Sequence, residues 1–236
     1  MSLLRGNQIA GAGDDWRELY QMAGFAAIFS ELVILLGFVT YFIWPYAPGR
    51  LSSEAILLLL QKDALGGLIS LDIFLFIGNL FSIFLFLALY VSLKQVNASY
   101  ALVALALGLL GLLLLIPARP IVELFNLSAQ YAVTSDPALK SQILAAATAL
   151  LALFDGTGWV MNLVLGGLSL LASSLLMLRS PLFSKAAAWA GMLTNLVACL
   201  FFVPVLGKFF LFLSLPGYMI WYFLLAKRFF QMARTG

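Results

Sequence analysis

The run MAGFAAIFSELVILLGFVTYFIW, residues 22–44, decides the fold class of this chain. Its only charged residue is Glu31, which lies near the middle. An α-helix rises 1.5 Å per residue, so about 20 predominantly apolar residues cross the hydrocarbon core of a bilayer. The run is therefore expected to form a transmembrane helix that carries one carboxylate at membrane depth.

The rest of the sequence repeats this apolar pattern. The chain of 236 residues is 64% hydrophobic and 10% charged, and its mean hydropathy is +1.07. Soluble domains are about half apolar and a quarter charged. We therefore predict an all-α polytopic membrane protein, a bundle of six transmembrane helices over residues 22–44, 73–93, 100–116, 158–178, 186–205 and 209–225.

These runs predict one transmembrane domain, residues 22–230, between a polar N-terminal tail at 1–21 and a C-terminal tail at 231–236. The first 21 residues lack the basic region and short apolar core of a signal peptide. Residues 55–65 and 138–154 are expected to form two outer amphipathic segments in the membrane interface. Residues 119–135 are expected to be irregular and are a candidate lid.

Two parts of the chain, residues 51–116 and 136–205, share one plan. Each reads as an outer helix, a glycine break, a span, a short turn and a second span, with the breaks at Gly66-Gly67 and at Gly156-Thr157-Gly158. One interpretation is a degenerate duplication with both copies in the same orientation, as in transporters whose sites lie between repeats. The other is a chance likeness of two hairpins rich in leucine and alanine.

The basic residues lie at the ends of the runs and predict the topology. With a cytoplasmic N-terminus, eight of them fall inside and five outside, which favours cytoplasmic N and C termini. The five outside are Arg50, Lys62, Arg119, Lys140 and Lys208, of which Arg50 and Arg119 lie close to run ends and argue the other way. No basic face suggests nucleic acid, so the expected partners are membrane lipids and, as a further candidate, other membrane-protein subunits.

The absence of histidine excludes more classes of function than any motif in the sequence supports. It removes histidine ligands for haem, zinc or di-iron centres and the base of a Ser-His nucleophile. No catalytic, cofactor-binding or metal-binding residue is therefore expected. The lone Cys199 cannot form an intrachain disulfide and is expected to be a small buried residue.

Few polar residues lie at membrane depth, and they define a candidate intramembrane polar site: Glu31, Asn79, Asn195, Asn162 and Asp72. Asparagines between helices usually act as hydrogen-bonding glue. An acid in a span is a functional hypothesis by default. Without a basic residue at its depth, Glu31 is expected to be neutral and hydrogen-bonded to Asn195 or Asn79; the alternative is a proton, cation or polar-ligand site.

Several short strings also carry a family resemblance. They are Ala23-Gly24-Phe25, Phe29-Ser30-Glu31, Asp72, residues 89–97 (LYVSLKQVN), Leu178-Arg179-Ser180-Pro181 and Trp189-Ala190-Gly191. In these the chain resembles the bacterial membrane family catalogued as domain of unknown function 4386, over about residues 20–230. The resemblance implies a multi-pass protein of the bacterial cytoplasmic membrane, with Glu31, Asp72 and the Lys94 turn at recurring polar positions, and attaches no activity.

Three classes of function follow in order of expectation. The first is a non-catalytic integral membrane protein, an accessory or structural subunit of a membrane complex or a lipid-binding scaffold. The second is a small-molecule or proton-coupled transporter that uses Glu31. The third is a membrane enzyme on a lipid-like substrate, with Asp72 and Asp155 as its carboxylates.

Overall fold

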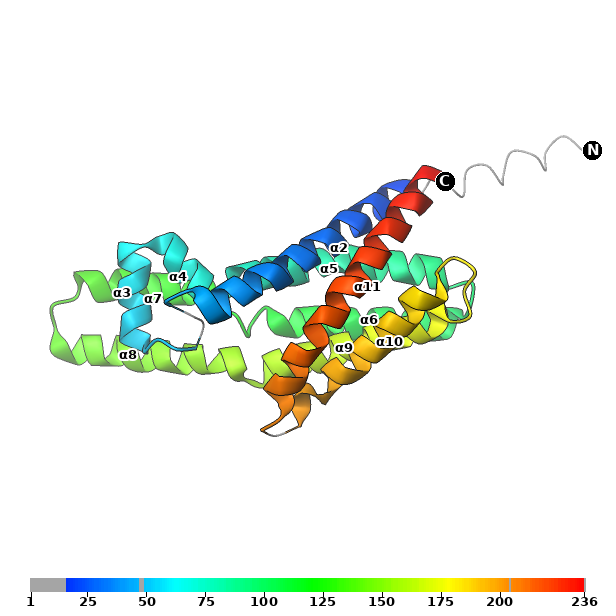
Figure 1. Cartoon of the computed structure of the whole chain (residues 1–236). Coiled ribbons are helices and arrows are strands. Elements are labelled where there is room, and N and C mark those ends of the chain that lie inside the picture. Colours follow the sequence, from blue (N-terminus) through cyan, green and yellow to red (C-terminus); the bar gives the residue numbers. More distant parts are fainter. Residues whose placement is uncertain (1–15, 47–48, 204, 236) are drawn as a thin grey trace, which may run out of the picture.

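The computed structural model describes residues 16–46, 49–203 and 205–235, and all regular secondary structure in these ranges is helical (Figure 1). In chain order the helices are α2 (Arg17–Phe38), the π-helix η1 (Val39–Ile43), α3 (Ser53–Lys62), α4 (Ala64–Ser70), α5 (Ile73–Leu93), α6 (Ala98–Leu115), α7 (Ile121–Val133), α8 (Pro137–Ala152), the 3-10 turn η2 (Leu153–Asp155), α9 (Thr157–Met177), α10 (Lys185–Cys199), the 3-10 turn η3 (Leu200–Phe202) and α11 (Gly207–Thr235). Residues 1–15 of the expected N-terminal tail lie outside the described part.

Among the described residues, five helical stretches are long and apolar enough to cross a membrane. They are Arg17–Ile43, Ile73–Leu93, Ala98–Leu115, Pro137–Met177 and Phe209–Thr235. The helix α10 has only 15 residues, and α11 continues to Thr235 through the expected C-terminal tail. The all-helical class predicted from the sequence is thus confirmed, with five candidate membrane spans among the described residues.

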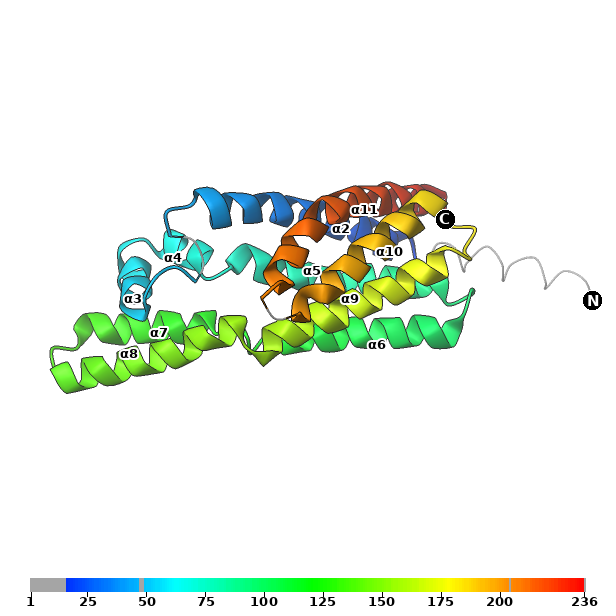
Figure 2. The same cartoon turned by 60° about the horizontal axis from the view of Figure 1, so that its bottom comes forward.

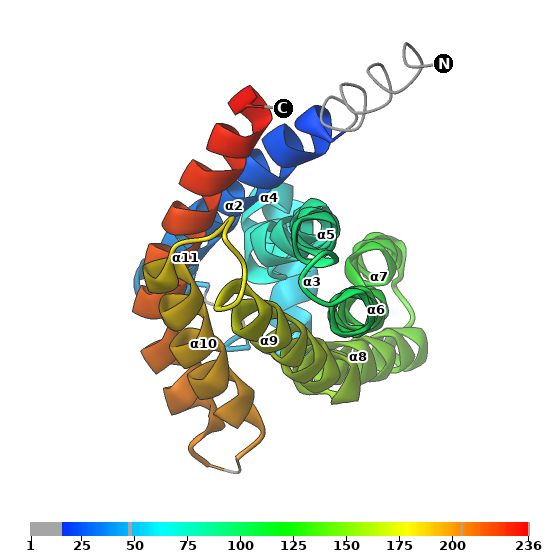
Figure 3. The ribbon, with the colours of Figure 1, turned by 90° about the vertical axis from the view of Figure 1, so that its right-hand side faces the viewer.

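Six helices pack in a closed ring. Each helix contacts the next in the order α2, α5, α6, α9, α10 and α11, and α11 returns to α2. Figure 3 shows this ring nearly end-on. Side chains from opposite helices fill its centre, among them Leu85, Leu89, Met177, Trp221 and Phe229, all at most 1% exposed. The described ends of the first and last helices, α2 and α11, lie at the same end of the molecule (Figure 1).

The other four helices, α3, α4, α7 and α8, form a unit that we call the cap. The cap extends beyond the end of the ring that lies away from both described termini (Figure 2). It has its own hydrophobic core: Ile56, Leu57, Leu60, Leu71, Leu124, Tyr131, Ile143 and Ala147. Hydrogen bonds from Ser128 Oγ to the Leu57 carbonyl (2.7 Å) and from Gln61 Nε2 to the Ser128 carbonyl (2.9 Å) join α3 to α7.

Local sequence signals set several helix ends. Ser52 accepts a hydrogen bond from the backbone N–H of Ala55 and begins α3. Asp136 caps α8, with Pro137 in its first turn. Side-chain acceptors of this kind satisfy the free N–H groups of a first helical turn. The break expected at Gly156-Thr157-Gly158 is also present, between η2 and α9.

Two local expectations were wrong. Residues 119–135 are not irregular, because Ile121–Val133 form α7, which buries Leu124, Ser128 and Tyr131 at helical spacing. The break expected at Gly66-Gly67 falls on either side of α4, at Asp63 and Asp72, because both glycines lie inside this short helix. The order of elements still follows the shared plan of residues 51–116 and 136–205, and the duplication itself stays a prediction.

Candidate functional site

Asp72 occupies the turn between α4 and α5, where the cap meets the ring. Its backbone is left-handed, with φ 60° and ψ 31°. Such a conformation costs a non-glycine residue about 1–2 kcal/mol and persists only where the surrounding structure fixes it. Asp72 is 8% exposed, so the turn directs a carboxylate into the protein rather than into solvent.

Tyr41 meets this carboxylate from the end of α2. Its hydroxyl donates to Asp72 Oδ1 at 3.0 Å and lies 3.2 Å from Oδ2. Tyr41 belongs to η1, where the backbone N–H of Trp44 bonds to the carbonyl of Val39 at 2.8 Å. Single π-helical turns are rare and often occur at functional sites. The contact therefore joins two local departures from regular backbone.

Arg119 completes the cluster from the turn between α6 and α7. Its Nη2 lies 3.4 Å from Asp72 Oδ2, and both side chains are buried. Its Nη1 donates to the carbonyls of Ala118 (3.0 Å) and Phe154 (3.1 Å). The guanidinium also lies 4.7 Å from the ring centre of Phe154 and 4.4 Å from that of Trp159. Arginine suits such a site because its planar group combines forked hydrogen bonds with stacking on aromatic faces.

Opposed electrostatic effects act on the cluster. Burial raises the pKa of Asp72, whereas the charge of Arg119 and the Tyr41 hydrogen bond lower it. Burial lowers the pKa of Arg119, and the charge of Asp72 opposes this. Asp155, at the start of the turn before α9, adds a negative charge that acts on both groups. The buried charges of Asp72 and Arg119 offset one another.

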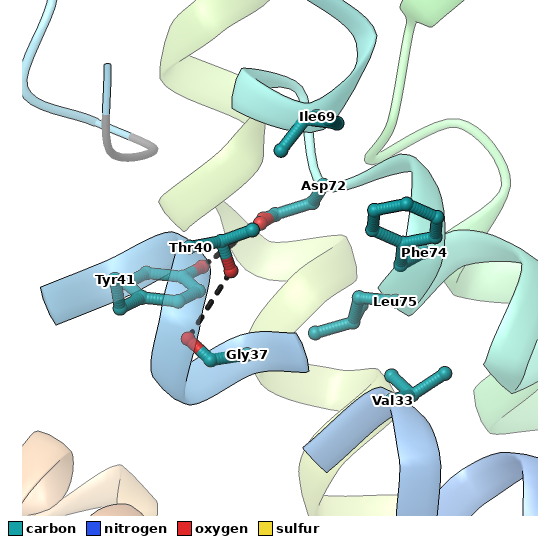
Figure 4. A pocket seen from close by; sticks show the side chains of 8 residues that line it. All are labelled: Val33, Gly37, Thr40, Tyr41, Ile69, Asp72, Phe74 and Leu75. Carbon is teal, nitrogen blue, oxygen red and sulfur yellow. Dashed lines mark hydrogen bonds between the residues drawn. The ribbon is translucent and has the colours of Figure 1, made fainter. Parts of the chain in front are cut away.

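A small cavity lies beside the cluster, between α2 and α5. It measures about 40 Å³ and is lined by Val33, Gly37, Thr40, Tyr41, Ile69, Asp72, Phe74 and Leu75. Figure 4 shows Asp72 and Tyr41 at its polar end and Val33 and Leu75 at its apolar end. The Thr40 hydroxyl there bonds back to the carbonyl of Gly37 at 3.1 Å. The cavity is large enough for a water molecule.

The five candidate residues from the sequence do not form one site. Asp72 belongs to the cluster, whereas Asn162 donates to the carbonyl of Gly111 at 3.0 Å and joins α9 to α6. Asn195 accepts a hydrogen bond from the Tyr218 hydroxyl at 2.8 Å and joins α10 to α11. Asn79 donates to the carbonyl of Leu75 in its own helix. Asn162 and Asn195 thus connect neighbouring helices.

Glu31 lies half-buried on α2. The hydrogen bond expected from it to Asn195 or Asn79 is not formed among the described residues. Asn79 donates within its own helix, and Asn195 donates to Gly191 and accepts from Tyr218. No group of three or more Cys, Asp or Glu side chains that could hold a metal ion comes together in residues 16–46, 49–203 and 205–235.

From the sequence, Tyr41 was not a candidate site residue, and Arg119 was only a topological charge. One signal was present, because Arg119 stands in the string Pro117-Ala118-Arg119-Pro120 directly after an apolar run. An arginine fixed between two prolines at a span end is a candidate for a specific contact as well as for a topological charge.

The ring, the cap and the buried cluster between them form an all-α fold in which five helical stretches of the described residues could cross a membrane. A family model described as Domain of unknown function (DUF4386) matches residues 22–227, a range that includes Tyr41, Asp72 and Arg119. The chain therefore belongs to this family, and the resemblance seen in the sequence is confirmed. Neither a curated protein nor a solved structure matched the chain.

Proposed function

We propose that this protein is a non-catalytic subunit of a membrane complex, or a lipid-binding scaffold, in which the cap contacts the partner. The observation that carries the proposal is the Tyr41–Asp72–Arg119 cluster. The Asp72 carboxylate accepts a hydrogen bond from Tyr41 at Oδ1 and pairs with Arg119 at Oδ2, and the guanidinium of Arg119 is held by two carbonyls and two aromatic rings. Because these groups bind one another, the cluster fits a structural role better than the role of a catalytic acid or nucleophile.

The cluster connects the cap to the ring at three turns. Tyr41 comes from η1, at the end of α2, Asp72 from the turn into α5, and Arg119 from the turn into α7. Arg119 also bonds to the carbonyl of Phe154 in η2, the 3-10 turn that follows α8. A buried ion pair that is already hydrogen-bonded fixes relative orientation. The cap is thereby held in one position as a platform.

Apolar side chains on the outside of the cap support a partner contact there. Val133 is 85% exposed, Val122 is 70% exposed, and Phe125 lies on the same helix, α7. Exposed apolar groups that lie close together mark contact surfaces in many proteins. The run from Pro137 to Met177 has 41 residues, which is about 60 Å of helix against about 30 Å of hydrocarbon. Part of this run must therefore lie outside the hydrocarbon, which suits a protruding α8.

For the topology we propose six crossings, by α2, α5, α6, α9, α10 and α11, in the bacterial cytoplasmic membrane. The short α10 packs along α9 and α11, both of which are long enough to span. Both termini are then cytoplasmic, and α3 and α8 are outer amphipathic segments.

Native mass spectrometry of the tagged chain, extracted from its own membrane in lipid nanodiscs, tests the subunit proposal. We expect the chain, 25.7 kDa, in an assembly of fixed stoichiometry. The variants Val122→Lys and Val133→Lys should release the partner, since both positions are exposed on the cap. The matched control is Gln95→Lys, at an exposed position at the opposite end. Recovery of the wild-type chain alone would contradict the proposal.

Transport is the second candidate, and the cavity beside Asp72 favours it. An irregular helix end, a buried carboxylate and a small cavity also occur at the ion sites of transporters. Ion or proton flux into proteoliposomes that is lost in Asp72→Asn and kept in Glu31→Gln would support transport through this cavity. Equal flux in both variants and in empty liposomes would contradict transport through this cavity.

A further inference from the structure

Thr194, on α10, differs from the other buried hydroxyl groups of the ring. The buried Ser169 donates across to the carbonyl of Ala104 on α6 (2.5 Å). Other buried serines in these helices bond back to their own backbone, as Ser30 does to Ala26 (2.9 Å) and Ser174 to Leu170 (2.7 Å). This is the usual way in which a helix satisfies a hydroxyl group in an apolar setting. Thr194 is 5% exposed, yet its hydroxyl forms no hydrogen bond with any residue that the structure describes.

The Thr194 side chain lines a groove between α10 and α11. The groove measures about 180 Å³ and is bounded by Leu193, Thr194, Val197, Leu213, Ser214 and Gly217. The hydroxyl of Ser214 is engaged, because it donates to the carbonyl of Leu211 at 2.7 Å. Thr194 is therefore the lining residue with hydrogen-bonding capacity to spare.

The backbone of α11 makes room for this groove. Pro216 lies inside the helix, and proline has no N–H for the carbonyl four residues earlier. At the next position, a Cβ in place of Gly217 would collide with Thr194 Oγ1. Glycine is thus needed for α11 to approach while the Thr194 hydroxyl keeps its position.

The surroundings of the groove limit what can enter it. Leu193 is 56% exposed and Leu213 is 55% exposed, so the rims face the outside of the ring along helices that we place in the membrane. The lining includes no charged residue. A ligand with a formal charge would leave that charge unpaired in a low-dielectric setting.

We propose that this groove, which we call the Thr194 groove, binds part of an uncharged lipid that carries a hydroxyl or carbonyl group, and that this group pairs with Thr194 Oγ1. The lipid enters sideways from the bilayer, and its apolar part lies against Leu193, Val197 and Leu213. An apolar cavity of about 150 Å³ accommodates benzene, so the groove has room for a ring or a short chain segment. This site lies apart from the cap and does not depend on the proposed subunit function.

Photolabelling in phosphatidylcholine nanodiscs tests the proposal. Two diazirine probes of equal length are compared, a long-chain alcohol and the corresponding alkane, and labelled residues are mapped by mass spectrometry. We expect the alcohol to label the residues that line the Thr194 groove. In Thr194→Val, which keeps the shape and removes the hydroxyl, this labelling should fall about 2–10-fold, the loss of one neutral hydrogen bond, while alkane labelling stays unchanged.

A second variant keeps the test decisive. Val197→Phe, on α10 as Thr194 is, fills the groove and should reduce labelling by both probes. Equal alcohol labelling in wild type and Thr194→Val would overturn the proposal, as would labelling spread evenly over lipid-facing residues. If the groove is labelled only after a partner subunit has been removed, a partner helix occupies it and the proposal is also overturned.

Discussion

Two carboxylates, Glu31 and Asp72, differ in what surrounds them. Glu31 lies half-buried in the middle of a span, whereas Asp72 lies buried at the edge of the ring with a tyrosine hydroxyl and a guanidinium against it. An acid at membrane depth therefore does not by itself mark the site where polar groups converge. Convergence occurs where turns from distant parts of the chain meet, because only there can several donors reach one carboxylate.

Removal of Arg119 should lower the free energy of unfolding more than any other change to these two carboxylates or their partners. Arg119→Met leaves the Asp72 carboxylate buried without its counter-charge, and loss of one partner of a buried pair costs about 3–5 kcal/mol. The free energy of unfolding in mixed micelles is the measurement. The double variant Arg119→Met, Asp72→Leu should recover part of the loss, since no charge then stays buried. If Arg119→Met is as stable as wild type, the contacts of Asp72 do not set it apart from Glu31.

The Tyr41 hydroxyl should have the next largest effect. Tyr41→Phe keeps the ring and removes the hydroxyl that donates to the Asp72 carboxylate. A hydrogen bond to a charged group contributes about 1.5–3 kcal/mol, and the same unfolding assay should report a loss in that range. The matched control is Tyr46→Phe, on an exposed ring close along the chain. Equal stability of the two variants would mean that the Asp72 contact is not stabilising.

A tyrosine–carboxylate pair in the cap shows what the same contact does near solvent. The Tyr131 hydroxyl donates to Glu54 at 2.6 Å, and this bond raises the pKa of Tyr131. Because the folded state favours the protonated phenol, its contribution is present below the ordinary pKa of about 10 and is lost as pH rises through the higher folded pKa. The stability difference between wild type and Tyr131→Phe should therefore shrink above that pH and be smaller throughout than the difference for Tyr41→Phe. A constant difference across this range would be inconsistent with the bond.

Glu31 should show the smallest effect. Glu31→Gln removes the ability to ionise and breaks no hydrogen bond or ion pair that the described residues make, so the free energy of unfolding should change by no more than about 0.5 kcal/mol. A loss as large as that of Tyr41→Phe would give Glu31 a structural role of the same rank as Asp72.

The spans could be predicted from the sequence because apolar length decides them. Residues 73–93 were predicted and found without change as α5, and the first span, expected at 22–44, is found as Arg17–Ile43. The cap was harder. The helix α7 stands between prolines and Asp136, and the residues that it buries, Leu124, Ser128 and Tyr131, form a short period that includes a polar serine.

The candidate site could be predicted only in part. Asp72 was found because acids are rare in such a chain, but its partners carry no local mark of their role. Tyr41 resembles the tyrosines and tryptophans expected at any membrane interface, and Arg119 resembles a topological charge. Their meeting depends on how α2, α5 and α6 end relative to one another, and that is set by packing in three dimensions.

Amide hydrogen exchange in Arg119→Lys tests most directly whether the cluster holds the cap to the ring. Lysine keeps the charge and loses the forked bonds to the carbonyls of Ala118 and Phe154 and the stacking on Phe154 and Trp159. Exchange reports local opening of separate units of a fold. We predict faster exchange in α3, α7 and α8 than in wild type, with α6 and α9 unchanged. Unchanged protection of the cap, or an equal loss over the whole ring, would contradict this account.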